Sequence, residues 1–212
     1  MRGLFIVLEG PEGAGKSTLA LQLAEWLRER VAGRPTTVTL TREPGGTPVS
    51  DAIRTVLLDP GQQIAPLTEF LLYSASRAQH VEDVIRPALE AGGAVICDRF
   101  TASSVAYQGA GRGLDQEFVT DLNSRVSHGC LPDLTILLDI DPEKGLERIR
   151  RRGEADRLER ADSGFHHRVA ESFRSQSAAA GWLTLDGSLP AEEVAARAMA
   201  GLNGLLERWL EG

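Results

Sequence analysis

An eight-residue glycine-rich segment near the N-terminus has the residue types and spacing of a phosphate-binding loop. It reads GPEGAGKS and matches the pattern G-x-x-x-x-G-K-[ST] at Gly10, Gly15, Lys16 and Ser17. Glycines let such a loop curl so that its backbone N–H groups point at phosphate oxygens, and a following helix adds its positive N-terminal end. The lysine can reach the β- and γ-phosphates, and the serine hydroxyl can bind Mg²⁺. The segment therefore predicts a site for a nucleoside triphosphate.

The residues on either side give this P-loop the strand and the helix that it needs. Residues 3–8 form a short apolar run typical of a strand buried on both faces, and residues 17–31 place leucines at helical spacing. Lys16 is one of two lysines in a chain whose other cations are arginines. A glycine-rich turn without function is the alternative, and it explains neither the lysine nor the context.

Two more charged segments follow predicted strands. Asp98 and Arg99 come directly after the apolar run AVIC, and Arg42 lies in TREPGGT after TTVTL. Carboxyl ends of parallel strands meet at the ligand crevice, so Asp98 is a candidate to hold the Mg²⁺ water shell or to activate an acceptor. Arg42 and Arg99 indicate a second phosphate site. A helix-capping Asp98 and an exposed, ion-paired Arg42 are the alternatives.

Strands and helices alternate along the whole chain. We expect strands at 3–8, 36–40, 94–97, 133–140 and 182–186, and helices at 17–31, 49–58, 66–91 (one or two), 118–127, 165–178 and 190–210. A further helix is expected from residue 145 into an arginine-rich segment that ends near residue 160. Such alternation predicts one α/β domain over residues 1–212, with a five-stranded parallel sheet flanked by helices in three layers.

Composition limits the classes of partner. The formal net charge of -7 disfavours a broad nucleic-acid surface, which needs a positive excess. The apolar run at the N-terminus is too short for a signal peptide or a membrane span. Cys97 and Cys130 have no metal-ligand spacing, which favours free thiols in a reducing compartment. We therefore expect a cytoplasmic protein that binds neither nucleic acid nor membrane.

Seven segments, taken together, resemble bacterial thymidylate kinase, a family of P-loop nucleoside monophosphate kinases. In chain order they are GPEGAGKST, TREPGGT, YSASRAQ, CDRF, AYQGAGRG, LPDLTILLD and RRGEADRLE. The resemblance covers nearly the whole chain, and TREPGGT and AYQGAGRG are much more specific than the P-loop. It implies the P-loop NTPase fold, transfer of the γ-phosphate of ATP to dTMP to give dTDP, a need for Mg²⁺, and a homodimer formed through the long middle helices.

The resemblance also implies a set of residues that bind dTMP. Arg42 and Arg99 would hold its phosphate, and Glu12 would hold the sugar 3′-hydroxyl. Tyr73 would stack on thymine, where phenylalanine is frequent in the family, and Arg77 would hydrogen-bond the base edge. The full set is Glu12, Arg42, Tyr73, Arg77, Arg99, Ser103, Ser104, Tyr107 and Gln108.

Within that set, Ser103 and Ser104 would meet the base, and Tyr107 would crowd C2′ and so favour deoxyribose. Taken singly, Tyr73 is better explained as a core aromatic residue and Arg77 as a solvated helix residue, so these roles depend on the neighbouring motifs. For ATP the resemblance and the P-loop pattern together give Gly10, Gly13, Ala14, Gly15, Lys16, Ser17, Thr18, Arg148 and Arg152. Ser17 and Asp98 are the expected metal ligands, and the loop around residues 186–190 is a candidate for adenine.

Residues 148–160 are expected to form a mobile, arginine-rich lid. The P-loop has no basic residue besides Lys16, so the charge of the transferring phosphoryl group needs a cation from elsewhere. Family members of this kind place it in the lid, and Arg152 is the best candidate, followed by Arg148 and Arg157. A solvated helix face is the alternative. Lys16, Asp98, Arg99 and Arg152 are thus the expected catalytic residues.

Two other functions share the P-loop. One is a different nucleoside monophosphate kinase or a deoxynucleoside kinase, although the latter need not carry two arginines for an acceptor phosphate. The other is a regulatory ATPase, which would bind ATP without acceptor-dependent turnover. No N-K-x-D guanine-reading motif occurs in the sequence, which argues against a signalling GTPase.

Overall fold

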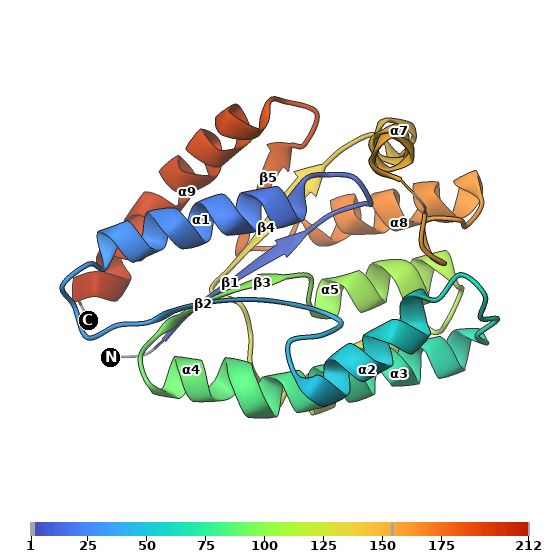
Figure 1. The fold of residues 1–212 in the computed structure, drawn as a ribbon, viewed down its shortest axis with the longest axis horizontal. Helices are drawn as coiled ribbons and strands as arrows, with labels where there is room; N and C mark the ends of the chain where they lie inside the picture. The colour runs from blue at the N-terminus through green and yellow to red at the C-terminus, as the bar shows by residue number, and fades with distance from the viewer. Residues whose placement is uncertain (1–2, 154, 212) are drawn as a thin grey trace.

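Residues 3–153 and 155–211 are described by a computed structural model of the chain, and five strands within them form one parallel sheet (Figure 1). The order across the sheet is β2 (Val38–Arg42), β3 (Ala94–Asp98), β1 (Leu4–Glu9), β4 (Leu134–Asp139) and β5 (Trp182–Asp186). All neighbouring strands run parallel. The expected five-stranded parallel sheet is confirmed.

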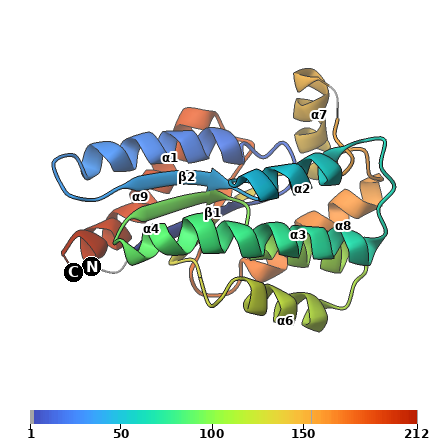
Figure 2. The same cartoon turned by 60° about the horizontal axis from the view of Figure 1, so that its bottom comes forward.

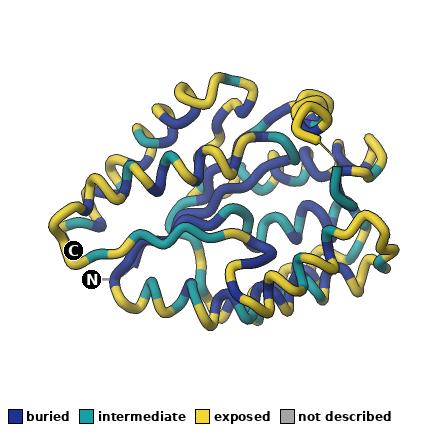
Figure 3. Tube along the Cα trace, viewed as in Figure 1, coloured by how far each residue is buried: buried dark blue, intermediate teal, exposed yellow. Residues whose placement is uncertain are grey.

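Helices cover both faces of the sheet and make three layers. Alternate residues of β1 point to opposite faces, as the pleat requires. Leu4, Ile6 and Leu8 pack with α1 (Lys16–Arg30) and α9 (Ala191–Glu211) on one face. Phe5 and Val7 pack on the other face, which explains why the strand reads as a continuous apolar run (Figure 3).

The second face carries one long helical rod. It consists of α3 (Pro66–His80), the π-helical turn η1 (Val81–Ile85) and α4 (Arg86–Glu90), which follow each other without a break (Figure 2). The π-turn lies just before Pro87, which has no N–H to donate and whose ring would crowd the carbonyl of Asp83 in a regular helix. The expectation of one or two helices over 66–91 is therefore met by one continuous helical rod that contains a π-helical turn at Val81–Ile85.

The remaining helices lie around this rod and at the open end of the sheet. Helix α2 (Pro48–Leu58) packs along α3, and α6 (Gln116–Val126) packs against α3 and the π-helical segment η2 (Val105–Gly111). Helix α8 (Ser163–Gln176) packs on η2, and α7 (Pro142–Arg152) contacts α8 at the upper right of Figure 1. No helix in the described ranges is long and apolar enough to cross a membrane.

Two local expectations need correction. Strand β2 begins and ends two residues later than expected, so Arg42 is its last residue. Helix α7 ends at Arg152 before Gly153 instead of continuing toward residue 160. The segment formed by α5 (Thr101–Ser104) and η2, for which no element was expected from the sequence, is helical, and Gly111 in it packs so closely on Phe165 that a Cβ would lie 2.6 Å from the ring.

Candidate active site

The carboxyl ends of β1, β2 and β3 open into a cavity of about 850 Å³. The P-loop, α3 and η2 all contribute residues to its lining. Helix α7 and the segment after it border the cavity, as does the loop that joins β5 to α9. Such a cavity at the carboxyl edge of a parallel sheet is where α/β proteins bind ligands.

The P-loop holds Lys16 in a buried position at the start of α1. Its Nζ donates to the carbonyls of Gly10 at 3.0 Å and Pro11 at 2.7 Å. Burial, with a smaller contribution from Arg99, lowers the pKa of Lys16 to about 8, although Glu12 and Asp98 act in the opposite direction. Gly13 has a φ of 70°, and a Cβ there would lie 2.1 Å from the carbonyl oxygen of Gly145. Glycine at position 13 thus lets the loop approach α7.

Ser17 and Asp98 place two oxygen ligands side by side. The Ser17 hydroxyl donates to Asp98 Oδ2 at 2.5 Å, and Asp98 ends β3 beside Leu8 of β1. One hydroxyl and one carboxylate suit Mg²⁺, which keeps most of its waters and takes the remaining ligands from phosphates. No group of three or more His, Cys, Asp or Glu side chains that could enclose a metal occurs in the described residues. The pair therefore fits a metal that arrives with a nucleotide.

Arg99, Glu12 and Tyr107 form a compact polar group on the cavity floor. Arg99 Nη2 donates to Glu12 Oε1 at 2.6 Å and to the Tyr107 hydroxyl oxygen at 3.0 Å, and the Tyr107 hydroxyl donates to Glu12 at 2.9 Å. Burial alone would raise the pKa of Glu12, but the charges of Arg99 and Lys16 outweigh it and lower that pKa to about 2. Glu12 is therefore an ionised acceptor for hydroxyl groups.

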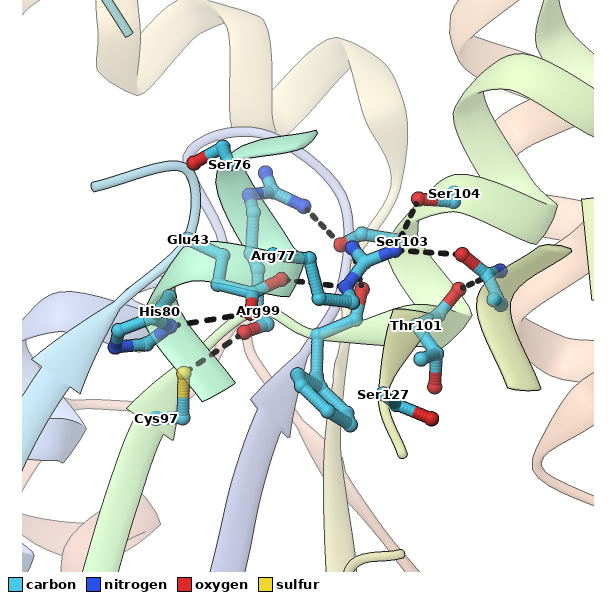
Figure 4. Close-up of polar contacts among 12 residues, drawn as sticks. Glu43, Ser76, Arg77, His80, Cys97, Arg99, Thr101, Ser103, Ser104 and Ser127 are labelled. Atoms are coloured by element: carbon cyan, nitrogen blue, oxygen red, sulfur yellow. Dashed lines mark hydrogen bonds and ion pairs between the residues drawn. The ribbon is translucent and has the colours of Figure 1, made fainter. Parts of the chain in front are cut away.

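Arg77 is held by four hydrogen bonds within the site (Figure 4). Its Nε donates to Glu43 at 2.7 Å and its Nη2 to the Phe100 carbonyl at 3.0 Å. Its Nη1 donates to Ser104 at 3.0 Å and to Asn123 at 2.6 Å. Arg77 is 1% exposed and still lines the cavity, so it is not the solvated helix residue that its sequence context allows.

The other residues expected to bind dTMP also lie at this end of the cavity. Tyr73 is buried and lines it one helical turn before Arg77, and burial raises the pKa of the Tyr73 phenol. Ser103 donates to Glu9, which sits buried beneath the site, and Gln108 donates to Glu69 at 2.9 Å. Together with Ser104 and Tyr107 these side chains line one continuous surface.

Sequence reasoning missed Arg54, which lies on α2 and lines the cavity beside Arg42. Its Nη1 donates to the Pro44 carbonyl at 2.8 Å. Burial and the neighbouring positive charge of Arg42 both lower the pKa of Arg54. Two guanidinium groups at one edge of a cavity repel each other unless an anion lies between them. The only sequence signal was an arginine inside an otherwise amphipathic helix, which solvation explains equally well.

The three lid arginines that are candidates for the catalytic cation have different partners. Arg148 donates to three backbone carbonyls, those of Gly13, Gly187 and Ser188, and so joins α7 to the P-loop and to the loop after β5. Arg152 lines the cavity and donates to Glu159 at 2.6 Å. Arg157 is tied to Glu69 at 2.5 Å and to the Leu57 carbonyl at 2.7 Å, away from the cavity lining. Residue 154 of this segment lies outside the described residues.

Not every expected ATP residue lines the cavity. Gly13, Ala14, Gly15, Lys16, Ser17 and Thr18 do, while Gly10 lies beneath the loop and offers its carbonyl to Lys16 and Arg99. Beyond Thr18 the cavity continues along Gln22 and the start of α9, next to residues 187–191. This end is mostly apolar or backbone, as a purine base requires.

Comparison with known proteins gives one family. The thymidylate kinase family model matches residues 8–198. The thymidylate kinase of Deinococcus radiodurans is 52% identical over 204 residues, which is 95% of this chain and 97% of that protein. That of Halothermothrix orenii is 49% identical over 92% of this chain and 93% of its own length.

Solved structures give the same answer. The crystal structure of thymidylate kinase from Ehrlichia chaffeensis matches with a TM-score of 0.76 and 31% sequence identity, over 95% of this chain and 99% of that one. Fold, P-loop and sequence therefore agree along nearly the whole length. The chain belongs to the thymidylate kinase family and is an ATP-dependent phosphotransferase of that family, with dTMP kinase activity.

Proposed function

We propose that the chain transfers the γ-phosphate of ATP to the phosphate of dTMP by bringing the two phosphates together in this one cavity. The observation that carries the proposal is the arrangement of cations. Lys16 and Arg99 lie at the P-loop, where Arg99 is bonded to Glu12, while Arg42 and Arg54 line the same space from β2 and α2. Phosphoryl transfer needs positioning and charge stabilisation more than acid–base chemistry, and this arrangement supplies both.

At the donor end, the P-loop N–H groups and Lys16 would hold the β- and γ-phosphates. Ser17 and Asp98 would hold Mg²⁺ through their adjacent oxygens, and the ion when bound would supply positive charge beside the phosphates. The apolar end near Gln22 and the start of α9 would take the adenine. Arg152 is our proposed transition-state cation, because Arg148 is held by backbone carbonyls and Arg157 by Glu69.

At the acceptor end, Arg42, Arg54 and Arg99 would hold the dTMP phosphate. The ionised Glu12 would accept a hydrogen bond from the sugar 3′-hydroxyl, and the Tyr107 ring, fixed by its bonds to Glu12 and Arg99, would leave no room for a 2′-hydroxyl. Tyr73 would stack on the base. Serines 103 and 104, Gln108 and Arg77 would border its edge.

The experiment is a coupled assay of ADP release from ATP with one acceptor at a time. dTMP, dUMP, dCMP, dGMP, AMP, UMP and thymidine are each supplied, with and without Mg²⁺. We expect turnover that depends strongly on dTMP and on Mg²⁺. Equal turnover without any acceptor would indicate a regulatory ATPase, and preference for thymidine would indicate a nucleoside kinase; either result would contradict the proposal.

We also propose that two copies associate through α3 and α6. Leu67 and Leu71 on α3 and Phe118 on α6 are large apolar side chains that stay exposed, and Phe118 contacts Phe70 edge-on. An apolar patch of this kind is typical of a surface that a second copy covers. Light scattering is expected to give twice the 22.9 kDa chain mass. A monomer mass at micromolar concentration would exclude this dimer.

We place the enzyme in the cytoplasm, where ATP is supplied and thiols stay reduced. Cys97 and Cys130 are both free, and Cys97 is buried with its Sγ against the Arg99 carbonyl at 3.0 Å. Burial raises the pKa of the Cys97 thiol, which keeps it protonated and inert.

A further inference from the structure

We propose that His80, a residue to which the site described above gives no role, positions the acceptor-binding residues by acting through Glu43. Glu43 in turn holds both Arg77 and the loop of residues 42–46. The inference rests on the proposed contact between Arg77 and the acceptor base.

The geometry is a chain of hydrogen bonds that joins β2 to α3, and Figure 4 shows its part among His80, Glu43 and Arg77. His80 Nε2 lies 2.6 Å from Thr41 Oγ1, and its Nδ1 lies 3.1 Å from Glu43 Oε1. The other carboxylate oxygen of Glu43 accepts from Arg77 Nε at 2.7 Å. The side chains of His80, Glu43 and Arg77 are 0%, 3% and 2% exposed, so water cannot replace any of these bonds.

The partners fix the role of one ring nitrogen of His80. Carboxylate oxygens accept hydrogen bonds, so Nδ1 donates to Glu43. The Thr41 hydroxyl can donate or accept, so it can pair with Nε2 in either role. The two bonds together determine the orientation of the ring from both sides.

The loop of residues 42–46 is folded around the imidazole. Gly46 has a φ of 90°, and a Cβ on it would lie 2.7 Å from His80 Nε2 and 2.7 Å from Thr41 Oγ1. The second glycine of TREPGGT thus leaves the space that the His80–Thr41 bond occupies. The same loop presents Arg42 and the Pro44 carbonyl that holds Arg54, so His80 supports two of the phosphate-facing arginines as well as Arg77.

The bonds that hold Arg77 leave one of its N–H groups for the substrate. Its guanidinium has five N–H donors, and the bonds to Glu43, Ser104, Asn123 and the Phe100 carbonyl use four of them. The remaining N–H, on Nη2, has no hydrogen-bond partner within the described residues, and Arg77 lines the cavity, so this N–H is the one that we assign to a carbonyl on the base edge. Thymine presents a carbonyl oxygen at C4, whereas cytosine presents an amino group there. Holding Arg77 still therefore favours dTMP over dCMP.

The test compares two substitutions that keep different halves of the imidazole. His80→Asn places an amide nitrogen near the position of Nδ1 and can still donate to Glu43. His80→Gln reaches toward Thr41 and has no donor at the Nδ1 position. Thr41→Val, which is isosteric, removes only the outer bond. The matched control is Ser76→Ala, because Ser76 is buried next to Arg77 and its hydroxyl has no hydrogen-bond partner.

We expect His80→Gln to raise the KM for dTMP about tenfold and to lower the dTMP-over-dCMP ratio of kcat/KM by a similar factor, since one bond to a buried charged group is lost. The KM for ATP and kcat should stay within about twofold. His80→Asn should recover most of the dTMP affinity, Thr41→Val should raise the KM about twofold, and Ser76→Ala should match the wild type.

Three results would overturn the inference. The first is equal rises in the KM values for dTMP and ATP, and the second is a lower Tm with an unchanged dTMP-over-dCMP ratio, because both describe a structural role alone. The third is an Asn variant no better than the Gln variant. If His80→Gln does not fold, the test uses Thr41→Val instead, and an unchanged dTMP-over-dCMP ratio of kcat/KM in that variant overturns the inference. Wild-type turnover independent of dTMP would instead refute the acceptor assignment, and it is measured first.

Discussion

Replacing Lys16 with methionine is expected to lower kcat/KM for ATP by about 10³-fold or more. Lys16 is the one cation of the P-loop, and it lies buried at the donor end of the cavity with its Nζ on two backbone carbonyls. Methionine has nearly the same length and no charge, so the loop keeps its shape while the phosphates lose their cation. Steady-state kinetics at saturating dTMP measures the loss.

Lys144→Met is the matched control, since Lys144 is the other lysine of the chain and is exposed on α7, outside the cavity lining. The Tm of Lys16→Met should stay within a few degrees of wild type, because burying an ammonium group opposes folding and its removal relieves that cost. Activity within tenfold of wild type would show that Lys16 does not stabilise the transferring phosphate.

The pH profile tests the same residue without mutation. Burial depresses the pKa of Lys16 from the ordinary 10.5 to about 8 in the ATP-free enzyme. Below pH 8 the ammonium is charged and can bind phosphate, and above pH 8 it progressively loses its proton. We therefore expect kcat/KM for ATP, which reports the free enzyme, to fall above pH 8. The free energy of unfolding changes in the opposite direction to the activity. Between pH 8 and 10.5 Lys16 is protonated in the unfolded chain but not in the folded one, so a rise in pH over this range stabilises the fold.

Replacing Arg152 with alanine is expected to lower kcat by about a hundredfold, with a smaller change in the KM for dTMP. Arg152 lines the cavity at the end of α7, and its partner Glu159 is buried while Arg152 itself is largely exposed. The guanidinium can therefore exchange Glu159 for the transferring phosphoryl group. A cation that acts only when charge spreads over that group affects kcat more than ground-state binding.

Arg151→Ala is the control for this variant, because Arg151 precedes Arg152 on α7 and pairs with Glu147 on the exposed surface. It should turn over at the wild-type rate. Unchanged kcat in Arg152→Ala would remove Arg152 from the mechanism. An equal loss in both variants would mean that the overall charge of α7 matters, and not Arg152 in particular.

The sequence by itself determined the elements whose cause is local. The P-loop depends on eight consecutive residues whose types follow from phosphate binding. Strand β1 was readable because a parallel strand covered on both faces must be apolar throughout, and helices α1 and α9 were readable from their periodicity. Asp98 and Arg99 were expected at the ligand edge because they directly follow a strand of this kind, and both line the cavity.

Tertiary structure alone decided the features that depend on partners distant in sequence. Arg77 looks like a helix surface residue until Glu43, Ser104 and Asn123, from three other segments, enclose it. The helical form of residues 101–111 follows from the packing of Gly111 on Phe165 and opposes the local preference of its glycines.

The arginines show the same division. Composition and spacing identified an arginine-rich segment, but side-chain bonds separate its members: Arg148 on backbone carbonyls, Arg152 at the cavity, Arg157 on Glu69. A guanidinium is chemically the same in all three places, and only the acceptors within its reach differ. The sequence therefore determined that this chain binds and transfers phosphate, and the packing of distant segments decided which arginines line the cavity.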